Sequence, residues 1–162
     1  MSSGDCYHPA LLPLSWLFGK WESTEAEVSY PTMSAVKYKE VLEIQPSEKP
    51  IIQYQSNTWH LEKKHKMHSE MGFFRIRPGT KEVALIASHN FGVAEVSEGE
   101  IEENFLRLES KSLSRMSFTE SASVVKIVRE WSLKSGILNF VLLMETSKHP
   151  LQTHLVCSYC RI

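Results

Sequence analysis

The last stretch of the chain carries one histidine, His154, among residues that suit a pleated strand, and it is the first candidate for chemistry. Pro150 marks a turn, and Cys157 and Tyr159 favour a half-buried strand, so the pattern predicts a closing strand over Leu151–Arg161. A strand aims His154 at one face of its sheet. There the imidazole is either a core or surface side chain that makes one hydrogen bond, or an axial ligand that holds a haem iron.

The three cysteines, Cys6, Cys157 and Cys160, do not make a disulfide framework. The last two have the CxxC spacing of zinc and redox sites. Residues three apart on a strand point to opposite faces, so these two sulfur atoms cannot share one metal without a bend, and no second CxxC completes a ligand set. The spacing therefore disfavours zinc here, and no Ser/His/Asp or Cys/His constellation provides a competing nucleophile.

Length and composition indicate one ordinary globular domain. The chain has 162 residues, 42% of them hydrophobic and 23% charged, with a formal net charge of −1. We expect a flexible tail over 1–7 and one domain over 8–162. The charge balance gives no field that favours nucleic acid, and neither a membrane-spanning run nor a leader is evident. A soluble cytoplasmic protein, small enough to enter the nucleus passively, is the expectation.

The elements that must position these residues are mostly strands. His8–Phe18 predicts a short helical plug, made irregular by Pro13. Beyond it, apolar residues alternate: Val36, Tyr38, Leu42 and Ile44 share one face, with Glu40 as the exception. The predicted strands are Ala35–Ile44, Ile51–Leu61, Met67–Arg77, Glu82–His89, Gly92–Val96, Phe105–Ser110, Ser114–Phe118, Val124–Leu133, Ile137–Thr146 and Leu151–Arg161.

Turn residues separate these strands. Pro46–Pro50, Pro78-Gly79, Glu98-Gly99-Glu100 and Lys134-Ser-Gly136 are predicted turns, and the basic run Lys63–Lys66 is interpreted as a solvated hairpin end. Ten short strands at this spacing predict an all-β fold, a ten-stranded antiparallel β-barrel with a short N-terminal helical cap. A closed barrel of this size can hold a small ligand.

Several segments, in this order and spacing, resemble the nitrobindin family of small haem-binding β-barrels. They are Leu14–Trp21, Tyr30-Pro-Thr32, Met67–Glu70, Gly72–Arg75, Gly92–Val96 and Pro150–Leu155. The resemblance covers most of the chain, from about His8 to Ile162. The same domain follows a THAP-type zinc finger in some animal proteins, but that module is not seen here, so DNA binding by that route is not expected.

The resemblance implies a barrel like that of the fatty-acid-binding proteins, with one ferric haem b near one mouth. It implies that His154 is the proximal iron ligand, that Thr32 lies against the haem, and that Met67, His68 and Met144 line the cavity. It further implies binding of nitric oxide and conversion of peroxynitrite to nitrate, with no nucleic-acid or membrane partner and at most a weak homodimer. An apolar slot with one imidazole suits a haem and leaves its sixth position open.

The sequence departs from the family pattern in three places. Only Gly19-Lys20-Trp21 remains of a glycine-rich signature, with Ser23 at the position of a further glycine. Glu145–His149 brings charges, among them Glu145 and Lys148, to where relatives carry threonines. His89-Asn-Phe91-Gly92 replaces an amide and a threonine. Phe91 therefore either blocks part of a pocket or packs over it.

His89 shares the alternating face of Val83, Leu85 and Ala87, so an inward face would aim its imidazole into the cavity. It then either hydrogen-bonds a neighbour at the rim or acts on a bound ligand from the distal side, and we include it among the cofactor-binding candidates.

Two other functions remain open. A carrier of a fatty acid or another apolar ligand would need a buried cation, for which Arg75, Arg107 and Arg129 are candidates. The other function is that of a haem-less scaffold that binds a partner.

Overall fold

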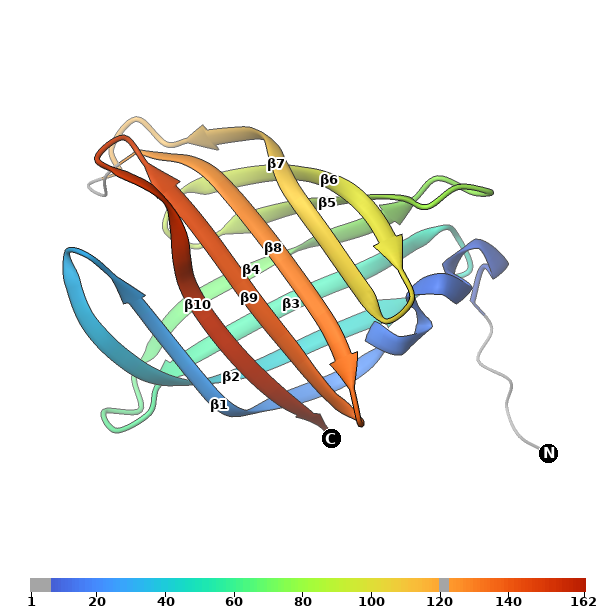
Figure 1. Cartoon of the computed structure of the whole chain (residues 1–162), viewed down its shortest axis with the longest axis horizontal. Helices are drawn as coiled ribbons and strands as arrows, with labels where there is room; N and C mark the ends of the chain where they lie inside the picture. The colour runs from blue at the N-terminus through green and yellow to red at the C-terminus, as the bar shows by residue number, and fades with distance from the viewer. Residues whose placement is uncertain (1–6, 120–122) are drawn as a thin grey trace.

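Ten antiparallel strands dominate the structure, a computed structural model that describes residues 7–119 and 123–162. Their bounds are β1 (Gly19–Tyr30), β2 (Met33–Pro46), β3 (Ile51–His60), β4 (Lys66–Ile76), β5 (Glu82–His89), β6 (Val93–Glu102), β7 (Phe105–Arg115), β8 (Val124–Lys134), β9 (Ile137–Thr146) and β10 (His149–Arg161). Each strand pairs with the next, and β1 also pairs with β10, so the sheet closes into a barrel (Figure 1). The predicted ten-stranded antiparallel barrel is confirmed. The predicted tail lies almost wholly in residues 1–6, outside the described part of the chain.

The period-two pattern sets which side chains enter the barrel. On β5, Val83, Leu85, Ala87 and His89 are all buried, as their alternation predicted. On β2, Glu40 is buried with its apolar neighbours rather than turned away from them. An inward strand face can therefore carry a charged residue, and such positions build the site described below.

Three details of the strand prediction were wrong, although the total of ten was right. β1 was missed, because Gly19–Tyr30 holds few apolar residues and is fixed by pairing with β2 and β10. Phe105–Ser110 and part of Ser114–Phe118 form one strand, β7. Glu98-Gly99-Glu100 is not a turn but continues β6, where Gly99 brings the β6 backbone close to that of β7.

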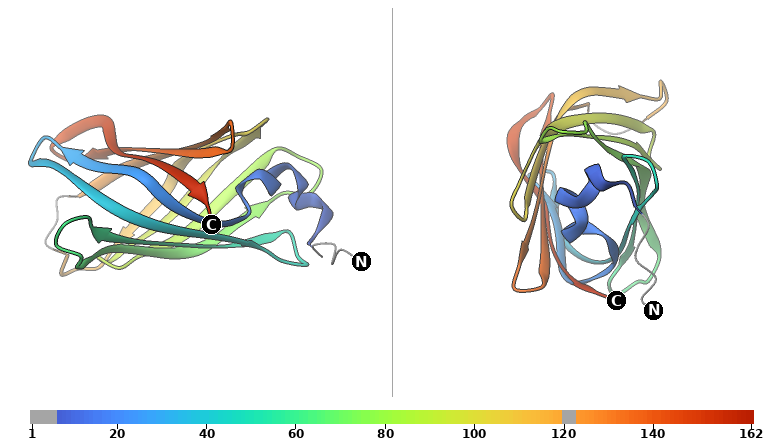
Figure 2. Two further views of the ribbon diagram at one scale, coloured as in Figure 1. Left: turned by 90° about the horizontal axis from the view of Figure 1, so that it is seen from below. Right: turned by 90° about the vertical axis from the view of Figure 1, so that its right-hand side faces the viewer.

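A 3-10 helix, η1 (Pro9–Leu17), closes one end of the barrel. Leu11, Leu14 and Leu17 are fully buried, and the Trp21 indole nitrogen donates to the carbonyl of Leu17 at 2.9 Å. Figure 2 shows η1 within the outline of the ring when the barrel is viewed end-on. The predicted irregular helical plug is confirmed. No helix in the described ranges is long and apolar enough to cross a membrane.

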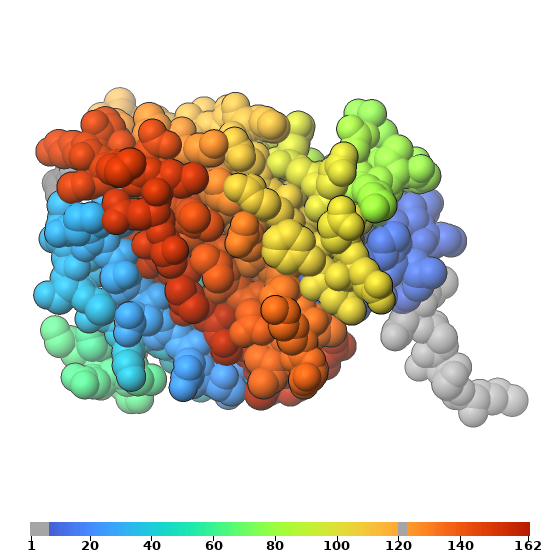
Figure 3. Space-filling model, viewed as in Figure 1, coloured from blue at the N-terminus to red at the C-terminus, as the bar shows by residue number. Residues whose placement is uncertain are grey.

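The opposite end carries the β1–β2 and β9–β10 turns (Figure 1). On the face shown in Figure 3, the side chains of β1 and β8–β10 form a continuous wall. The polar turn Lys63–Lys66 is exposed, as predicted for a solvated hairpin end. η1 occupies one of the two ends of the barrel, and the turns named above occupy the other.

Candidate functional site

A cavity of about 140 Å³ lies inside the barrel and is partly open to solvent. This is smaller than the roughly 300–1,000 Å³ usual for small-molecule and cofactor sites, so side chains of its wall must move to admit a cofactor. One part of its wall is apolar and the other carries imidazoles and carboxylates. The lining residues are Val28, Tyr38, Glu40, Ser56, Thr58, Met67, His68, Glu70, His89, Phe91, Val93, Val124, Ile127, Arg129, Phe140, Leu142, Met144, His154 and Leu155.

His154 lies on β10 and faces this cavity. Its Nδ1 is 2.8 Å from the carbonyl oxygen of Ser29 on β1, and only a protonated Nδ1 can donate to that acceptor. The other nitrogen, Nε2, then keeps its lone pair. Burial lowers the pKa of His154 below its ordinary value, although the Ser29 carbonyl partly offsets this effect. His154 is thus a neutral imidazole in the tautomer that a metal ligand requires.

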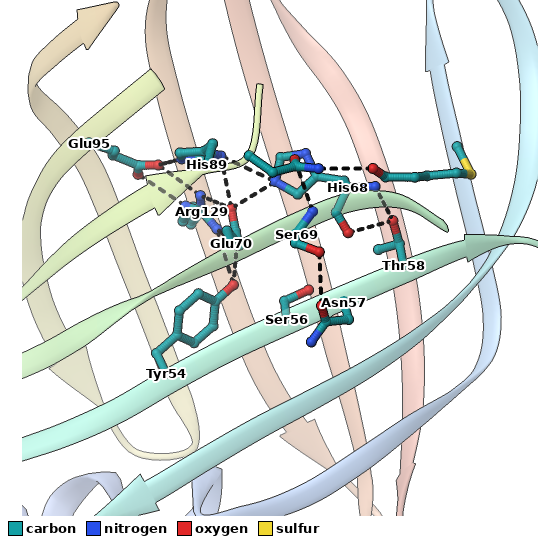
Figure 4. A network of polar contacts seen from close by, with 12 residues as sticks. Tyr54, Ser56, Asn57, Thr58, His68, Ser69, Glu70, His89, Glu95 and Arg129 are labelled. Atoms are coloured by element: carbon teal, nitrogen blue, oxygen red, sulfur yellow. Dashed lines mark hydrogen bonds and ion pairs between the residues drawn. The ribbon is translucent and has the colours of Figure 1, made fainter. Parts of the chain in front are cut away.

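The polar wall is built around Arg129 of β8, whose side chain is fully buried. Its guanidinium donates to both oxygens of Glu70 on β4, at 2.8 and 3.0 Å, and to both oxygens of Glu95 on β6, at 3.0 and 2.7 Å. A remaining N–H faces the Tyr54 hydroxyl at 3.5 Å. All five guanidinium hydrogens therefore have partners inside the protein (Figure 4).

These contacts keep both carboxyl groups ionised. Burial alone would raise the pKa of Glu70, but the charge of Arg129 and a hydrogen bond from His68 outweigh it and hold the pKa well below the usual range. Burial is likewise outweighed at Glu95, where Arg129 and the His89 hydrogen bond lower the pKa to about 2. Two carboxylates thus face one guanidinium in the low-dielectric interior.

His89 lies between the two carboxylates. Its Nδ1 is 3.1 Å from Glu70 Oε2 and 3.2 Å from His68 Nε2, and its Nε2 is 3.1 Å from Glu95 Oε2. The Phe91 ring lies 5.0 Å from the His68 ring and 5.3 Å from the His89 ring, centroid to centroid. Phe91 therefore packs over the two imidazoles at the cavity wall, and His89 is a buried member of the network rather than a rim residue.

Glu40 is a third buried carboxyl, separate from this network. It accepts a hydrogen bond from Ser56 Oγ at 2.5 Å, and within residues 7–119 and 123–162 no side chain forms an ion pair with it. Burial raises the pKa of Glu40 above its ordinary value, although the Ser56 hydroxyl partly opposes the shift. Glu40 therefore holds its proton to higher pH than an exposed glutamate does, in contrast to Glu70 and Glu95.

The structure brings most of the predicted site residues together. His154, Met67, His68, His89 and Met144 all line the one cavity. Thr32 lies in the turn between β1 and β2, where it is exposed and outside the set of lining residues. Its contact with a haem stays a prediction.

The residues at which the sequence departs from the family pattern lie in different parts of the structure. Glu145 and Lys148 lie near the β9–β10 turn and do not line the cavity, whereas Phe91 does. Cys157 is buried and Cys160 exposed, on opposite faces of β10 as the spacing predicted, and both are free thiols.

Sequence reasoning missed Glu70, Glu95 and Arg129 as a site. The sequence did indicate that these side chains point inward, because each lies on the same alternating face of its strand as buried apolar residues. Glu70 shares its face with Phe74, and Arg129 shares its face with Trp131. Two inward acids and one inward base predict mutual pairing. The alternation of residues alone did not show which strands would face one another across the barrel.

A closed antiparallel barrel, plugged at one end and holding a neutral, oriented histidine against an apolar wall, is the architecture of a cofactor-binding β-barrel. The chain belongs to the family described as "THAP4-like, heme-binding beta-barrel domain", whose sequence model matches residues 10–161. This confirms the family predicted from the sequence.

Three relatives illustrate the likeness. The chain is 36% identical over 157 residues to the peroxynitrite isomerase THAP4 of Rattus norvegicus, covering 96% of the chain but 28% of that protein. It is 38% identical over 150 residues to the peroxynitrite isomerase Rv2717c of Arabidopsis thaliana, covering 91% of the chain and 86% of that protein. The crystal structure of Rv2717c from M. tuberculosis superposes with a TM-score of 0.85 at 27% identity, covering 96% of this chain and 99% of that one.

Proposed function

We propose that the chain binds one ferric haem b through His154, binds nitric oxide, and isomerises peroxynitrite to nitrate. The observation that carries this proposal is the 2.8 Å contact from His154 Nδ1 to the Ser29 carbonyl, which leaves Nε2 unprotonated at the cavity. The names of the relatives, peroxynitrite isomerases, support the activity.

The chemistry of the cavity lining suits a haem. His154 supplies a neutral nitrogen donor, and Val28, Leu142, Met144 and Leu155 supply apolar surface for a porphyrin face. A bound ferric haem supplies a Lewis-acidic iron with one coordination position open to a small ligand. The chain orients that group by fixing the imidazole tautomer, and its apolar wall limits the water around it.

The polar wall of the cavity, which lies opposite His154, affects how an anionic substrate would bind. In the ring order, β10 and β5 are five places apart in either direction, so His154 and His89 stand on opposing sides of the barrel. Both ring nitrogens of His89 already face carboxylates, but the side chain of His68 is 32% exposed at the cavity, where an anion such as peroxynitrite could accept a hydrogen bond from its ring.

A fatty-acid carrier is not supported by the arginines. Arg75 and Arg107 are exposed on the outside of the barrel, and the five N–H groups of Arg129 already have partners. A carboxylate ligand would have to displace Glu70 or Glu95 from a buried, bidentate ion pair, which costs several kcal/mol. The geometry therefore favours haem over a fatty acid.

The binding test is hemin titration of wild-type and His154→Ala protein, followed by absorption spectroscopy. We expect a stable ferric spectrum for wild type and its loss in the variant, with unchanged circular dichroism, because a ten-stranded core does not depend on one side chain. His149→Ala, at the start of the same strand, is the matched control and should bind hemin normally. An unaltered spectrum and affinity in His154→Ala would refute the assignment.

The activity test compares ferric haem-loaded and haem-free protein at equal concentration. The loaded form should speed decay of peroxynitrite to nitrate and protect free tyrosine from nitration. The haem-free form controls for oxidation of its own Met and Cys side chains. Equal protection by both forms would mean that the chain acts only as a sacrificial thiol and thioether. Failure of the wild-type protein to bind hemin in the titration would favour a haem-less scaffold.

A further inference from the structure

Three potential metal-ligating atoms meet on the polar wall of the cavity: His68 Nε2, His89 Nδ1 and Glu70 Oε2. The three distances between them are 3.2 Å for the two nitrogens, 3.1 Å from His89 to Glu70, and 3.4 Å from His68 to Glu70. Ligands about 2.0–2.2 Å from a common ion, at angles of about 90–110°, stand roughly 2.9–3.5 Å apart. The triangle therefore has the dimensions of one face of a metal coordination shell.

We propose that His68, Glu70 and His89 form a binding site for a divalent transition-metal ion, distinct from the haem site at His154. Two imidazoles and one carboxylate are the ligand set of zinc and of non-haem iron(II) centres with open positions. The ligands come from neighbouring strands, with Glu70 on β4 paired directly with His89 on β5. A barrel sheet holds such ligands rigidly.

The surroundings of His89 match those of a metal-bound histidine. A ligating imidazole usually donates its second ring N–H to a carboxylate, which fixes its orientation. His89 Nε2 is 3.1 Å from Glu95 Oε2, and Glu95 is itself held by Arg129 and by the Ser97 hydroxyl. With a metal on Nδ1, the neutral ring satisfies both of its nitrogens (Figure 4).

Charge on the wall also favours a cation. Glu70 and Glu95 carry two negative charges, and in the described part of the chain Arg129 is the one guanidinium that pairs with them. The cluster of these three residues therefore has a net charge of −1 when both imidazoles are neutral. Buried charge is costly unless it is compensated. A metal ion or a proton on His89 would supply the compensation, and these two cases give different results in a metal titration.

The site is reachable from the cavity. The side chain of His68 is 32% exposed, and both histidines line the cavity, while Phe91 covers them on one side. Glu70 is largely buried and fixed through Arg129 and the Tyr54 hydroxyl, so it is preorganised to accept an ion rather than free to move. An ion bound here would keep a coordination position directed at the cavity.

The test uses the haem-free full chain after chelator treatment, titrated with Zn²⁺ by calorimetry and with Co²⁺ by visible absorption. We expect one ion per chain and a cobalt d–d spectrum of nitrogen and oxygen ligation. His68→Ala and His89→Ala should each weaken binding at least about tenfold, and Glu95→Gln should weaken it about 10–100-fold while leaving the three ligands in place. Circular dichroism separates loss of binding from loss of folding, and the partly exposed His68 gives the variant least likely to unfold.

The matched control is His65→Ala, because His65 is exposed at the β3–β4 turn and lies beside another imidazole, the partly buried His60, with ring centroids 5.3 Å apart. That variant and His154→Ala should both keep the ion. Loss of the ion in either control, retention in folded His68→Ala, or no stoichiometric uptake by wild type would each overturn the proposal. Since no haem is present, the result is independent of the proposed isomerase activity.

Discussion

At the scale of single residues, the cavity separates acidic groups by their environment. Glu70 and Glu95 share the Arg129 guanidinium and remain ionised, whereas Glu40 has the Ser56 hydroxyl and no cation. The pKa of Glu40 is therefore raised by burial, while the pKa values of the other two are lowered by Arg129 against the effect of burial. Identical side chains thus have pKa values shifted in opposite directions within one cavity.

The raised pKa of Glu40 predicts a pH-dependent stability. Above the ordinary value of 4.5, the folded state binds more protons at Glu40 than the unfolded state, so this carboxyl makes the free energy of unfolding fall as pH rises toward its folded pKa. Glu40→Gln, which cannot titrate, should remove this decline. Urea denaturation between about pH 5 and pH 8 measures it.

Glu43→Gln is the matched control, because Glu43 lies on the outer face of the same strand and pairs with Lys20 at 3.1 Å. The free energy of unfolding of Glu43→Gln should fall with rising pH as it does in wild type. If the free energy of unfolding of Glu40→Gln and of wild type changed in parallel across that range, Glu40 would not be a buried acid with a raised pKa.

At the scale of elements, the contact between β4 and β5 sets the polar wall. Gly72 on β4 pairs with Ala87 on β5, and a Cβ added at Gly72 would lie 1.8 Å from the Ile86 carbonyl oxygen. Two residues away, Glu70 pairs with His89. The close backbone approach that glycine permits therefore lies directly beside the carboxylate and imidazole of the site.

Gly72→Ala should lower the free energy of unfolding by about 3 kcal/mol or more, because the obstacle is backbone that cannot rotate away. Gly79→Ala is the comparison: Gly79 has φ +77° with nothing within 4 Å of an added Cβ, so it should lose only about 1–2 kcal/mol from left-handed backbone strain. Chemical denaturation measures both. A loss at Gly72 no larger than that at Gly79 would show that the two strands can move apart freely.

At the scale of the whole molecule, the barrel is closed at one end by η1 and carries its cavity in the remaining interior. The short helix covers this end (Figure 2), and its Leu11, Leu14 and Leu17 are fully buried. Burial of these side chains joins an otherwise separate N-terminal segment to the core. The plug therefore contributes to the stability of the whole barrel.

Leu14→Ala should destabilise the protein by about 2–5 kcal/mol through loss of buried apolar surface and the cavity left behind. Leu12→Ala, two residues away on the same helix but 63% exposed, should change stability by no more than about 0.5 kcal/mol. Thermal and urea unfolding of the two variants give the comparison. Equal effects would mean that η1 does not pack into the barrel end in solution.

The sequence by itself determined the repeating features of this protein. Alternation of apolar residues predicted the inward faces of β2 and β5, turn residues marked most strand ends, and the strand context of His154 made it a candidate ligand. These features are local, since the period of a strand is set by its own backbone. The resemblance of ordered segments added the family and the haem, and the family match confirms the first of these.

Only the tertiary structure decided what meets across the barrel. Glu70, His89, Glu95 and Arg129 come from β4, β5, β6 and β8, and no spacing along the chain shows that their side chains converge. β1 could not be predicted from its own sequence for the same reason. It has few apolar residues, and its pairing with β10 and β2 holds it in place. Ring closure fixes which strands face each other, and that is a property of all ten strands together.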